Sequence, residues 1–64
     1  MPNPTHTQDV VKFGTESEKG LQVTIPDGEI MWLPWSQIEH VEREPDGTGQ
    51  VTMSEWIAKQ KGLL

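Results

Sequence analysis

A strictly alternating segment followed by a proline-aspartate-glycine turn constrains this chain more than any other feature. Apolar and polar residues alternate without exception over residues 21–25, which is typical of a strand buried on one face. Pro26 suits the first position of a turn, and Gly28 suits the left-handed position of a bulged three-residue loop. The predicted hairpin therefore closes with Ile25 opposite Glu29, and this pair sets the register of both strands.

This register divides the hairpin into two unlike faces. On one face Thr24 lies opposite Ile30, and Gln22 lies opposite Trp32, so polar and apolar side chains are mixed. The other face is wholly apolar and is the predicted core: Leu21, Val23, Ile25, Met31 and Leu33. Trp32 on the mixed face needs a cover, which is either another element of the domain or a partner.

Shorter signals predict the rest of the chain. Residues 1–8 contain two prolines and one apolar side chain, so we expect a disordered tail, with residues 9–64 forming a single small β-rich domain. The further expected elements are strands at 9–14, 39–44 and 50–52, a tight or 3₁₀ turn within 33–38, a second turn at 45–49, and a helix at about 53–61. The predicted fold is mainly β with one short C-terminal helix, as a small bent antiparallel sheet or an open SH3-like or OB-like barrel.

The chain is short and lacks cysteine, which limits how it is stabilised. Its 64 residues hold one small core, and without disulfides the stability has to come from packing or from a partner. The lack of cysteine favours a reducing compartment, and the first residues show no signal-peptide pattern, so we expect a cytoplasmic location. The uncharged stretch at 30–38 is too short to span a membrane.

The chemical inventory argues against catalysis, metals and cofactors. His6 and His40 lie far apart in the sequence, and there is no cysteine to complete a metal site with them. The serines Ser17, Ser36 and Ser54 fit no nucleophile motif, and no glycine-rich phosphate-binding pattern is present. We therefore expect a protein that is not an enzyme and that binds no cofactor and no metal.

Three tryptophans are more than a core of this size needs. Trp56 is expected in the core, because the predicted helix has no other large anchor. Trp32 fits either a core position beneath the helix or an exposed platform. Trp35 lies in a turn between proline and serine, and it is the best candidate for a contact with a partner.

Acidic residues concentrate in one predicted strand of a chain whose net charge is −5. Glu39, Glu42 and Glu44 form this acidic edge. One interpretation is a solvated edge strand whose charges prevent pairing between copies. The other is a surface that attracts a basic partner, also by imitating nucleic acid. With Trp35 and Trp32, these three glutamates are the predicted partner-binding residues.

Three segments resemble a family of small bacteriophage and prophage proteins. They are residues 18–23, 27–38 and 54–63, which read as an apolar strand, an Asp-Gly turn with a Trp-x-Pro-x-Ser-Gln-Ile segment, and a closing Glu-Trp-x-Ala helix that ends in Lys-Gly-Leu. The resemblance implies an accessory protein acting in the host cytoplasm and implies no reaction. Trp35 departs from the family pattern, in which a polar or basic residue is usual, and this indicates a specialised contact.

These features predict a non-catalytic accessory protein that binds a host or phage protein through a tryptophan-bearing face and an acidic edge. Two alternatives stay open. Single-stranded nucleic acid can stack on exposed tryptophans, although the net charge disfavours it. The acidic surface can also inhibit a host DNA-binding or defence protein by mimicking nucleic acid. A homodimer that covers Trp32 and Ile30 is a further possibility, and no membrane partner is expected.

Overall fold

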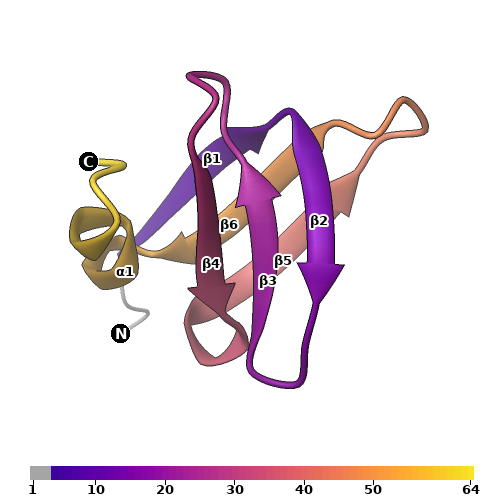
Figure 1. The fold of residues 1–64 in the computed structure, drawn as a ribbon. Coiled ribbons are helices and arrows are strands. Elements are labelled where there is room, and N and C mark those ends of the chain that lie inside the picture. Colours follow the sequence, from indigo (N-terminus) through magenta and orange to yellow (C-terminus); the bar gives the residue numbers. More distant parts are fainter. Residues whose placement is uncertain (1–3) are drawn as a thin grey trace.

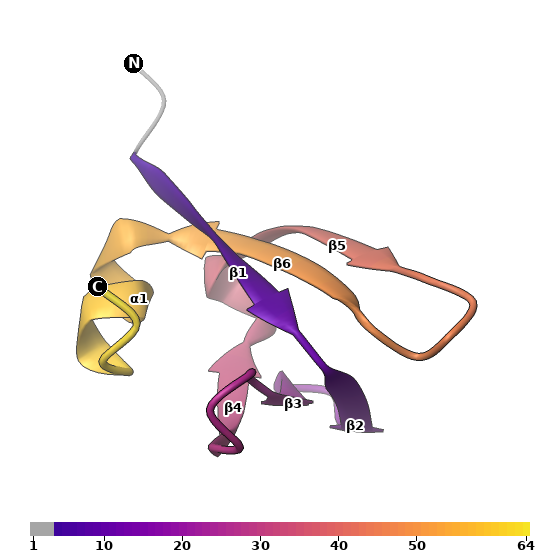
Figure 2. The ribbon, with the colours of Figure 1, turned by 90° about the horizontal axis from the view of Figure 1, so that it is seen from above.

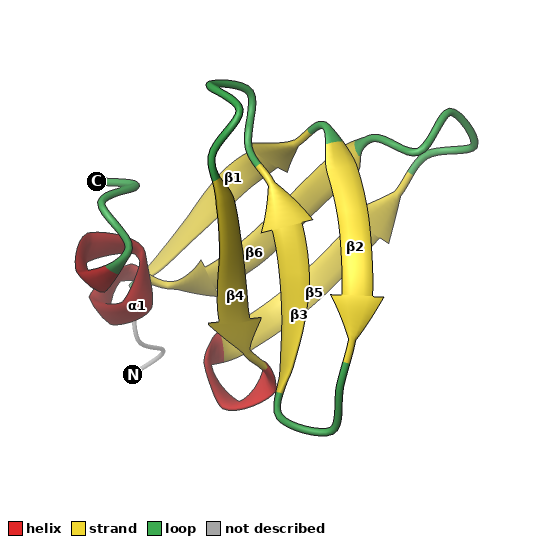
Figure 3. Ribbon diagram, viewed as in Figure 1, coloured by secondary structure: helices red, strands yellow, loops and turns green. Residues whose placement is uncertain are grey.

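A computed structural model describes residues 4–64 of the chain, which are mainly β. The elements are β1 (Thr5–Val10), β2 (Lys12–Glu16), β3 (Gly20–Thr24), β4 (Ile30–Pro34), the 3₁₀ helix η1 (Trp35–Gln37), β5 (Ile38–Arg43), β6 (Gly49–Ser54) and helix α1 (Glu55–Gln60). Figure 1 shows their arrangement, and Figure 3 shows the single short α-helix beside the strands. The predicted class, mainly β with one short C-terminal helix, is confirmed.

The strands form two antiparallel sheets of three strands each. Sheet A has the order β1-β6-β5, and sheet B has the order β2-β3-β4. Figure 2 shows the sheets as two layers, and in Figure 1 the strands of sheet A run diagonally behind those of sheet B. The chain crosses between the layers at Val11 and again through η1. No strand pairing joins the two sheets within residues 4–64, so the described fold is open and does not form a closed barrel.

The central hairpin forms with the predicted register. Thr24 lies opposite Ile30, and the pairing continues along β3 and β4 as expected. Gly28 has a φ of 94°, and its N–H donates to the carbonyl of Ile25 at 2.9 Å. The N–H of Ile25 donates to the carbonyl of Glu29 at 3.0 Å. Glycine adopts this conformation without strain, so the three-residue turn forms as predicted. The turn fixes the register of the hairpin, and the register decides which side chains of β4 face the core.

The core lies between the two sheets and is filled from both. All five apolar residues predicted from the hairpin are buried. Sheet A adds Val10, Val51 and Met53, and the helix adds Ile57 and Ala58. No polar or charged residue is buried in the described chain, so this small interior is held together by apolar packing.

The prediction of a disordered tail is wrong for residues 5–8. Residues 1–3 lie outside the described part of the chain, but from Thr5 onward the backbone forms β1, which pairs with β6 along its whole length. A polar strand is ordered in this way because backbone hydrogen bonds to a neighbouring strand do not depend on apolar side chains. Val10 at the end of β1 then adds a fully buried anchor.

The other predicted elements are present with shifted ends. The strand expected at 9–14 is divided between β1 and β2, which belong to different sheets, because the chain turns a corner at Val11. The strand expected at 50–52 extends to Ser54, and the helix expected from about residue 53 begins later. Ser54 is its N-cap, since the hydroxyl accepts a hydrogen bond from the N–H of Ile57 at 3.3 Å.

Candidate binding surface

An exposed apolar pair on β4 distinguishes the outer face of sheet B. Ile30 and Trp32 point away from the core, with 61% and 43% of their surface exposed. The cause is the alternation of side chains along a strand, since the residues next to them face inward. Their partners on β3 are the half-buried Thr24 and Gln22. Trp32 is therefore a platform on the surface and is not covered by the helix.

The polar neighbour of Trp32 is engaged elsewhere. The side chain of Gln22 reaches towards β2, where its Oε1 accepts a hydrogen bond from the N–H of Thr15 at 3.3 Å. Gly14 makes room for this, because a Cβ at that position would overlap the Gln22 side chain. The side-chain amide of Gln22 is thus held on the side of β3 that faces β2. It does not cover the indole of Trp32.

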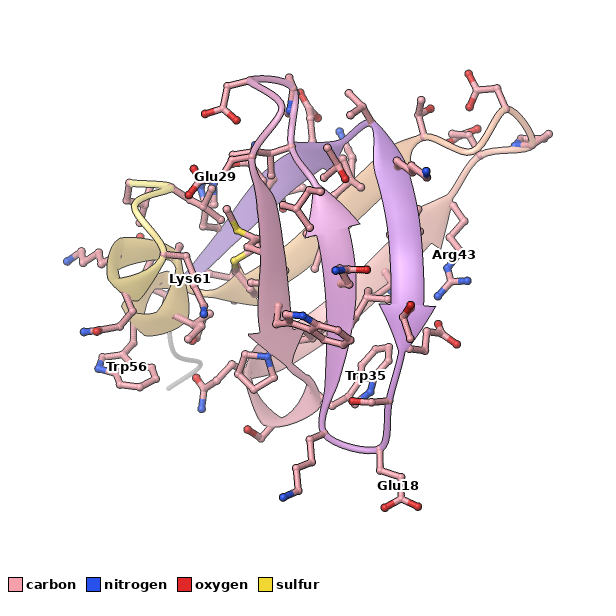
Figure 4. The ribbon with its side chains drawn as sticks, in the orientation of Figure 1. Glu18, Glu29, Trp35, Arg43, Trp56 and Lys61 are labelled. Carbon is pink, nitrogen blue, oxygen red and sulfur yellow. The ribbon has the colours of Figure 1, made fainter. Side chains whose placement is uncertain are left out.

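Trp35 has an internal role that the sequence does not reveal. It lies in η1, is half-buried and packs against the core. Its indole N–H donates to the carbonyl of Ser17 at 2.7 Å, which ties η1 to the turn between β2 and β3 (Figure 4). Its predicted contact with a partner stays a prediction, with only part of the ring available for it.

The expectation that Trp56 lies in the core is wrong. Its side chain is 61% exposed, and Figure 4 shows it on the side of α1 that points away from both sheets. The reason is the geometry of the helix, because side chains one residue apart differ by about 100° in direction, and with Ile57 and Ala58 turned inward Trp56 lies outside. Trp56 lines a groove of about 430 Å³ together with Pro4, Gln37, Ser54, Glu55 and Lys59. The signal that would have placed it is the adjacent apolar pair Ile57 and Ala58, because this short helix buries that pair and turns Trp56 away.

The acidic edge lies along β5 and the turn that follows it. Glu39, Glu42 and Glu44 are all exposed. The cation of this strand, Arg43, does not neutralise them, because its guanidinium pairs with Glu16 and lies 5.0 Å from the centre of the Phe13 ring. Figure 4 shows Arg43 beside β2. Within residues 4–64 no lysine or arginine pairs with Glu39, Glu42 or Glu44, and the His40 imidazole lies 3.6 Å from Glu42.

The structure does not bring the acidic edge and Trp32 together. Glu42 lies opposite Gln50 of β6, which in turn lies opposite Asp9 of β1, and this row is on the outer face of sheet A. Trp32 is on the outer face of sheet B. Because the inner faces of the two sheets meet in the core, their outer faces look in opposite directions. A compact partner that covers Trp32 does not also reach Glu42.

Two turns have the same sequence, Pro-Asp-Gly, and the same geometry. One closes the β3–β4 hairpin of sheet B, and the other closes the β5–β6 hairpin of sheet A. In the second turn Gly47 has a φ of 93°, and its N–H donates to the carbonyl of Glu44 at 3.0 Å. Here the Asp46 carboxylate also accepts hydrogen bonds from the Thr48 hydroxyl at 2.7 Å and from the Thr48 N–H at 3.0 Å. These two bonds, the hydroxyl bond first, hold the pKa of Asp46 below its ordinary value of 3.8.

A hollow of about 480 Å³ lies near both turns and the Val11 corner. Its lining residues are Asp9, Val10, Val11, Pro26, Glu44, Thr48, Gly49 and Gln50. The Asp9 carboxylate already accepts a hydrogen bond from the Gln50 amide at 3.0 Å. The one side-chain hydroxyl in this lining, that of Thr48, already donates a hydrogen bond to the Asp46 carboxylate.

Residues 4–64 show neither a metal-binding cluster nor a membrane-spanning helix. Residues 4–64 contain no cluster of three histidine, aspartate or glutamate side chains suited to hold a metal ion. In the same residues no helix has the length and apolar character needed to cross a membrane.

Comparisons of the chain with protein-family models, with curated proteins and with solved structures give no match.

Proposed function

We propose that the protein is a non-catalytic accessory module that acts in the cytoplasm and binds a host or phage protein. The contact is centred on Trp32 and Ile30. The observation that carries the proposal is the exposure of this neighbouring pair on a strand without charged residues. Large aromatic side chains beside aliphatic ones are typical of binding hot spots. Covering them removes apolar surface from water, which stabilises the complex.

Trp35 supplies the end of the same contact. It follows β4 directly in η1, and its ring is only half-buried even though its N–H is bonded to Ser17. Because that bond fixes the ring, no side-chain freedom is lost when a partner packs against it. In this proposal the exposed part of Trp35 extends the contact made by Ile30 and Trp32, and the protein acts by occupancy, without a chemical step.

The acidic edge acts at longer range in this proposal. Glu42 faces away from Trp32, so its charge influences the approach of a basic partner more than the final contact. Together with Glu39 and Glu44, it raises the rate of association with such a partner at low salt. Reversing these charges is therefore expected to slow association and leave dissociation nearly unchanged.

The decisive experiment compares two tryptophans that are both exposed. Wild-type protein, Trp32→Ala and Trp56→Ala are immobilised, treated with a bacterial lysate, and the captured proteins are quantified by mass spectrometry. A partner held by wild type and by Trp56→Ala but lost by Trp32→Ala supports the proposal. A partner that Trp32→Ala retains at full level overturns it, because the two variants remove the same side chain from different surfaces.

A fluorescence titration tests whether the partner is nucleic acid instead. Tryptophan emission is followed while a single-stranded oligonucleotide is added at low salt. We expect no quenching, since the net charge of −5 repels a phosphate backbone. Quenching that disappears in Trp32→Ala would contradict a protein partner and assign the same surface to base stacking.

A further inference from the structure

Strand β4 differs from the other edge strands in having no charged side chain. The sheet orders make β1 and β5 the edges of sheet A, and β2 and β4 the edges of sheet B. Exposed edges are normally protected from pairing with another chain by charges or by bulges. The charged residues of the other three edges are Asp9 in β1, Lys12 and Glu16 in β2, and Glu39, Glu42 and Arg43 in β5. The β2 and β5 pairings also contain register irregularities, whereas the β4 pairing has none.

The free edge of β4 consists of the backbone groups of Ile30 and Trp32. Hydrogen-bonded and non-hydrogen-bonded pairs alternate along an antiparallel ladder. Ile25 opposite Glu29 is a hydrogen-bonded pair, with an N···O distance of 3.0 Å. Counting from it, Ile30 and Trp32 occupy non-bonded positions, so their N–H and C=O groups point away from β3. Within residues 4–64 β3 is the only strand that pairs with β4, and helix α1 makes its main contacts with β6 and β1 in the other sheet.

We propose that two copies of this chain pair antiparallel along β4, with the twofold axis at Met31. This register places Ile30 of each copy opposite Trp32 of the other. Each such pair exchanges two backbone hydrogen bonds, so every outward N–H and C=O of these two residues is satisfied in both copies. The same pairs set a β-branched side chain against an aromatic one, a combination that stabilises antiparallel sheets.

The choice of a second copy as the occupant follows from this self-complementarity. A twofold interface requires one segment to match itself, and β4 does so in the Met31 register. Moving the axis to Trp32 would set Ile30 opposite Pro34, which has no N–H, and would leave the Ile30 carbonyl unpaired. Moving it to Ile30 would bring the turn residue Gly28 into the ladder. One register therefore satisfies the edge fully.

Charge and size set the conditions for this dimer. Each copy carries a net charge of −5, but none of that charge lies on β4, so added salt strengthens the pairing by screening the remaining repulsion. The contact is smaller than the standard interface of roughly 1,600 Å², so we expect a weak dimer with a Kd on the order of 100 µM. The dimer doubles the exposed Ile30 and Trp32 pair on one continuous sheet, and it does not depend on the proposed function.

Sedimentation equilibrium and amide hydrogen exchange test the proposal on the wild-type protein. Between roughly 10 µM and about 1 mM the mass is expected to rise from monomer towards dimer. Over the same range the amides of Ile30 and Trp32 are expected to become protected, while those of Met31 and Leu33, which face β3, stay protected throughout. A monomer at all concentrations overturns the proposal. So does a dimer in which the Ile30 and Trp32 amides keep exchanging rapidly.

A matched pair of variants separates edge pairing from general repulsion. Ile30→Glu and Thr24→Glu add the same charge to the same face, but Thr24 lies on the central strand β3. Ile30→Glu is expected to weaken dimerisation about tenfold or more, because it removes two favourable cross-strand pairs. Thr24→Glu is expected to change it by less than about twofold. Equal weakening by both contradicts the proposal, and if Ile30→Glu does not fold, the exchange experiment on wild type decides.

Discussion

The outer faces of the two sheets are built from strands of similar length and behave differently. On sheet A, side chains from neighbouring strands bond one another: the hydroxyls of Thr7 and Thr52 lie 3.0 Å apart, and the Gln50 amide donates to Asp9 at 3.0 Å. On sheet B, the largest outward side chain is Trp32, and the amide opposite it is bonded elsewhere. A face whose polar groups satisfy one another gains little from a partner. A face with uncovered apolar area gains most.

The same difference extends to the edges of the sheets. β5 ends sheet A with charged residues and an irregular register, which discourages another strand from pairing there. β4 ends sheet B without either protection. In a chain of this size, one side is thus built to remain in water and the other is left available for contact.

The largest expected effect comes from comparing two neighbouring residues of β4 that face opposite sides of the sheet. Leu33→Ala, at a position 1% exposed, is expected to lower the free energy of unfolding by about 2–5 kcal/mol, which is enough to unfold a domain this small. Trp32→Ala is expected to lower it by about 1 kcal/mol, because much of the ring is already in water. Urea denaturation followed by circular dichroism measures both. Losses of equal size would mean that Trp32 belongs to the core.

A smaller effect compares Trp35, whose indole N–H is bonded to Ser17, with Trp56, which is exposed on α1. Trp35→Phe removes the hydrogen bond to the Ser17 carbonyl and is expected to cost about 1 kcal/mol of stability. Trp56→Phe removes nothing that the described chain uses, and less than about 0.5 kcal/mol is expected. In wild type the indole N–H of Trp35 should exchange more slowly with solvent than that of Trp56. If the two indoles exchange at the same rate, the link between η1 and the β2–β3 turn does not persist in solution.

The smallest effect concerns the second Pro-Asp-Gly turn, which contains Asp46. The pKa of Asp46 is lowered by the Thr48 hydroxyl and backbone N–H, so this carboxylate stabilises the folded turn at pH values above 3.8, and the stabilisation is lost as the pH falls through the folded pKa. Thr48→Val removes the hydroxyl bond and should raise the pKa of Asp46 towards 3.8, while the backbone bond keeps it from rising fully. An NMR titration of the Asp46 carboxyl measures the shift. An unchanged pKa in the variant would show that the hydroxyl bond is not its main cause.

The hairpin of β3 and β4 could be predicted down to its register because its determinants are local. Alternation over a few residues assigns the faces, and Pro26 with Gly28 assigns the turn. The mixed outer face followed from the same argument, so Trp32 was a predicted binding residue. Ile30 enters the prediction only through the homodimer that covers it together with Trp32, because the alternation places both on the same outer face.

Trp35 could not be placed from the sequence because its position depends on a residue that is distant along the chain. Trp35 is oriented by a carbonyl in the β2–β3 turn, and no local pattern announces that bond. Trp56 is directed outward because Ile57 and Ala58 occupy the inward side of α1, which begins two residues later than predicted. Neighbouring side chains on a helix lie about 100° apart, so a helix of six residues cannot bury all three.

The order of residues 5–8 likewise depends on β6, which lies more than forty positions further along the chain. A polar strand has no signal of its own, because backbone pairing is available to almost any sequence once a neighbouring strand exists. Local composition therefore predicts disorder where the fold supplies a partner.

Local sequence patterns are sufficient to predict the mainly β class, the central hairpin with its two faces, and the five side chains that begin the core. These depend on side-chain period and turn chemistry, which act between near neighbours. The tertiary structure alone decided that the strands separate into two sheets, that Trp35 is held by Ser17 while Trp56 faces solvent, and that Trp32 and the acidic edge look in opposite directions. The physical reason is that a side chain's exposure depends on what packs over it, and here the packing elements come from distant parts of the chain.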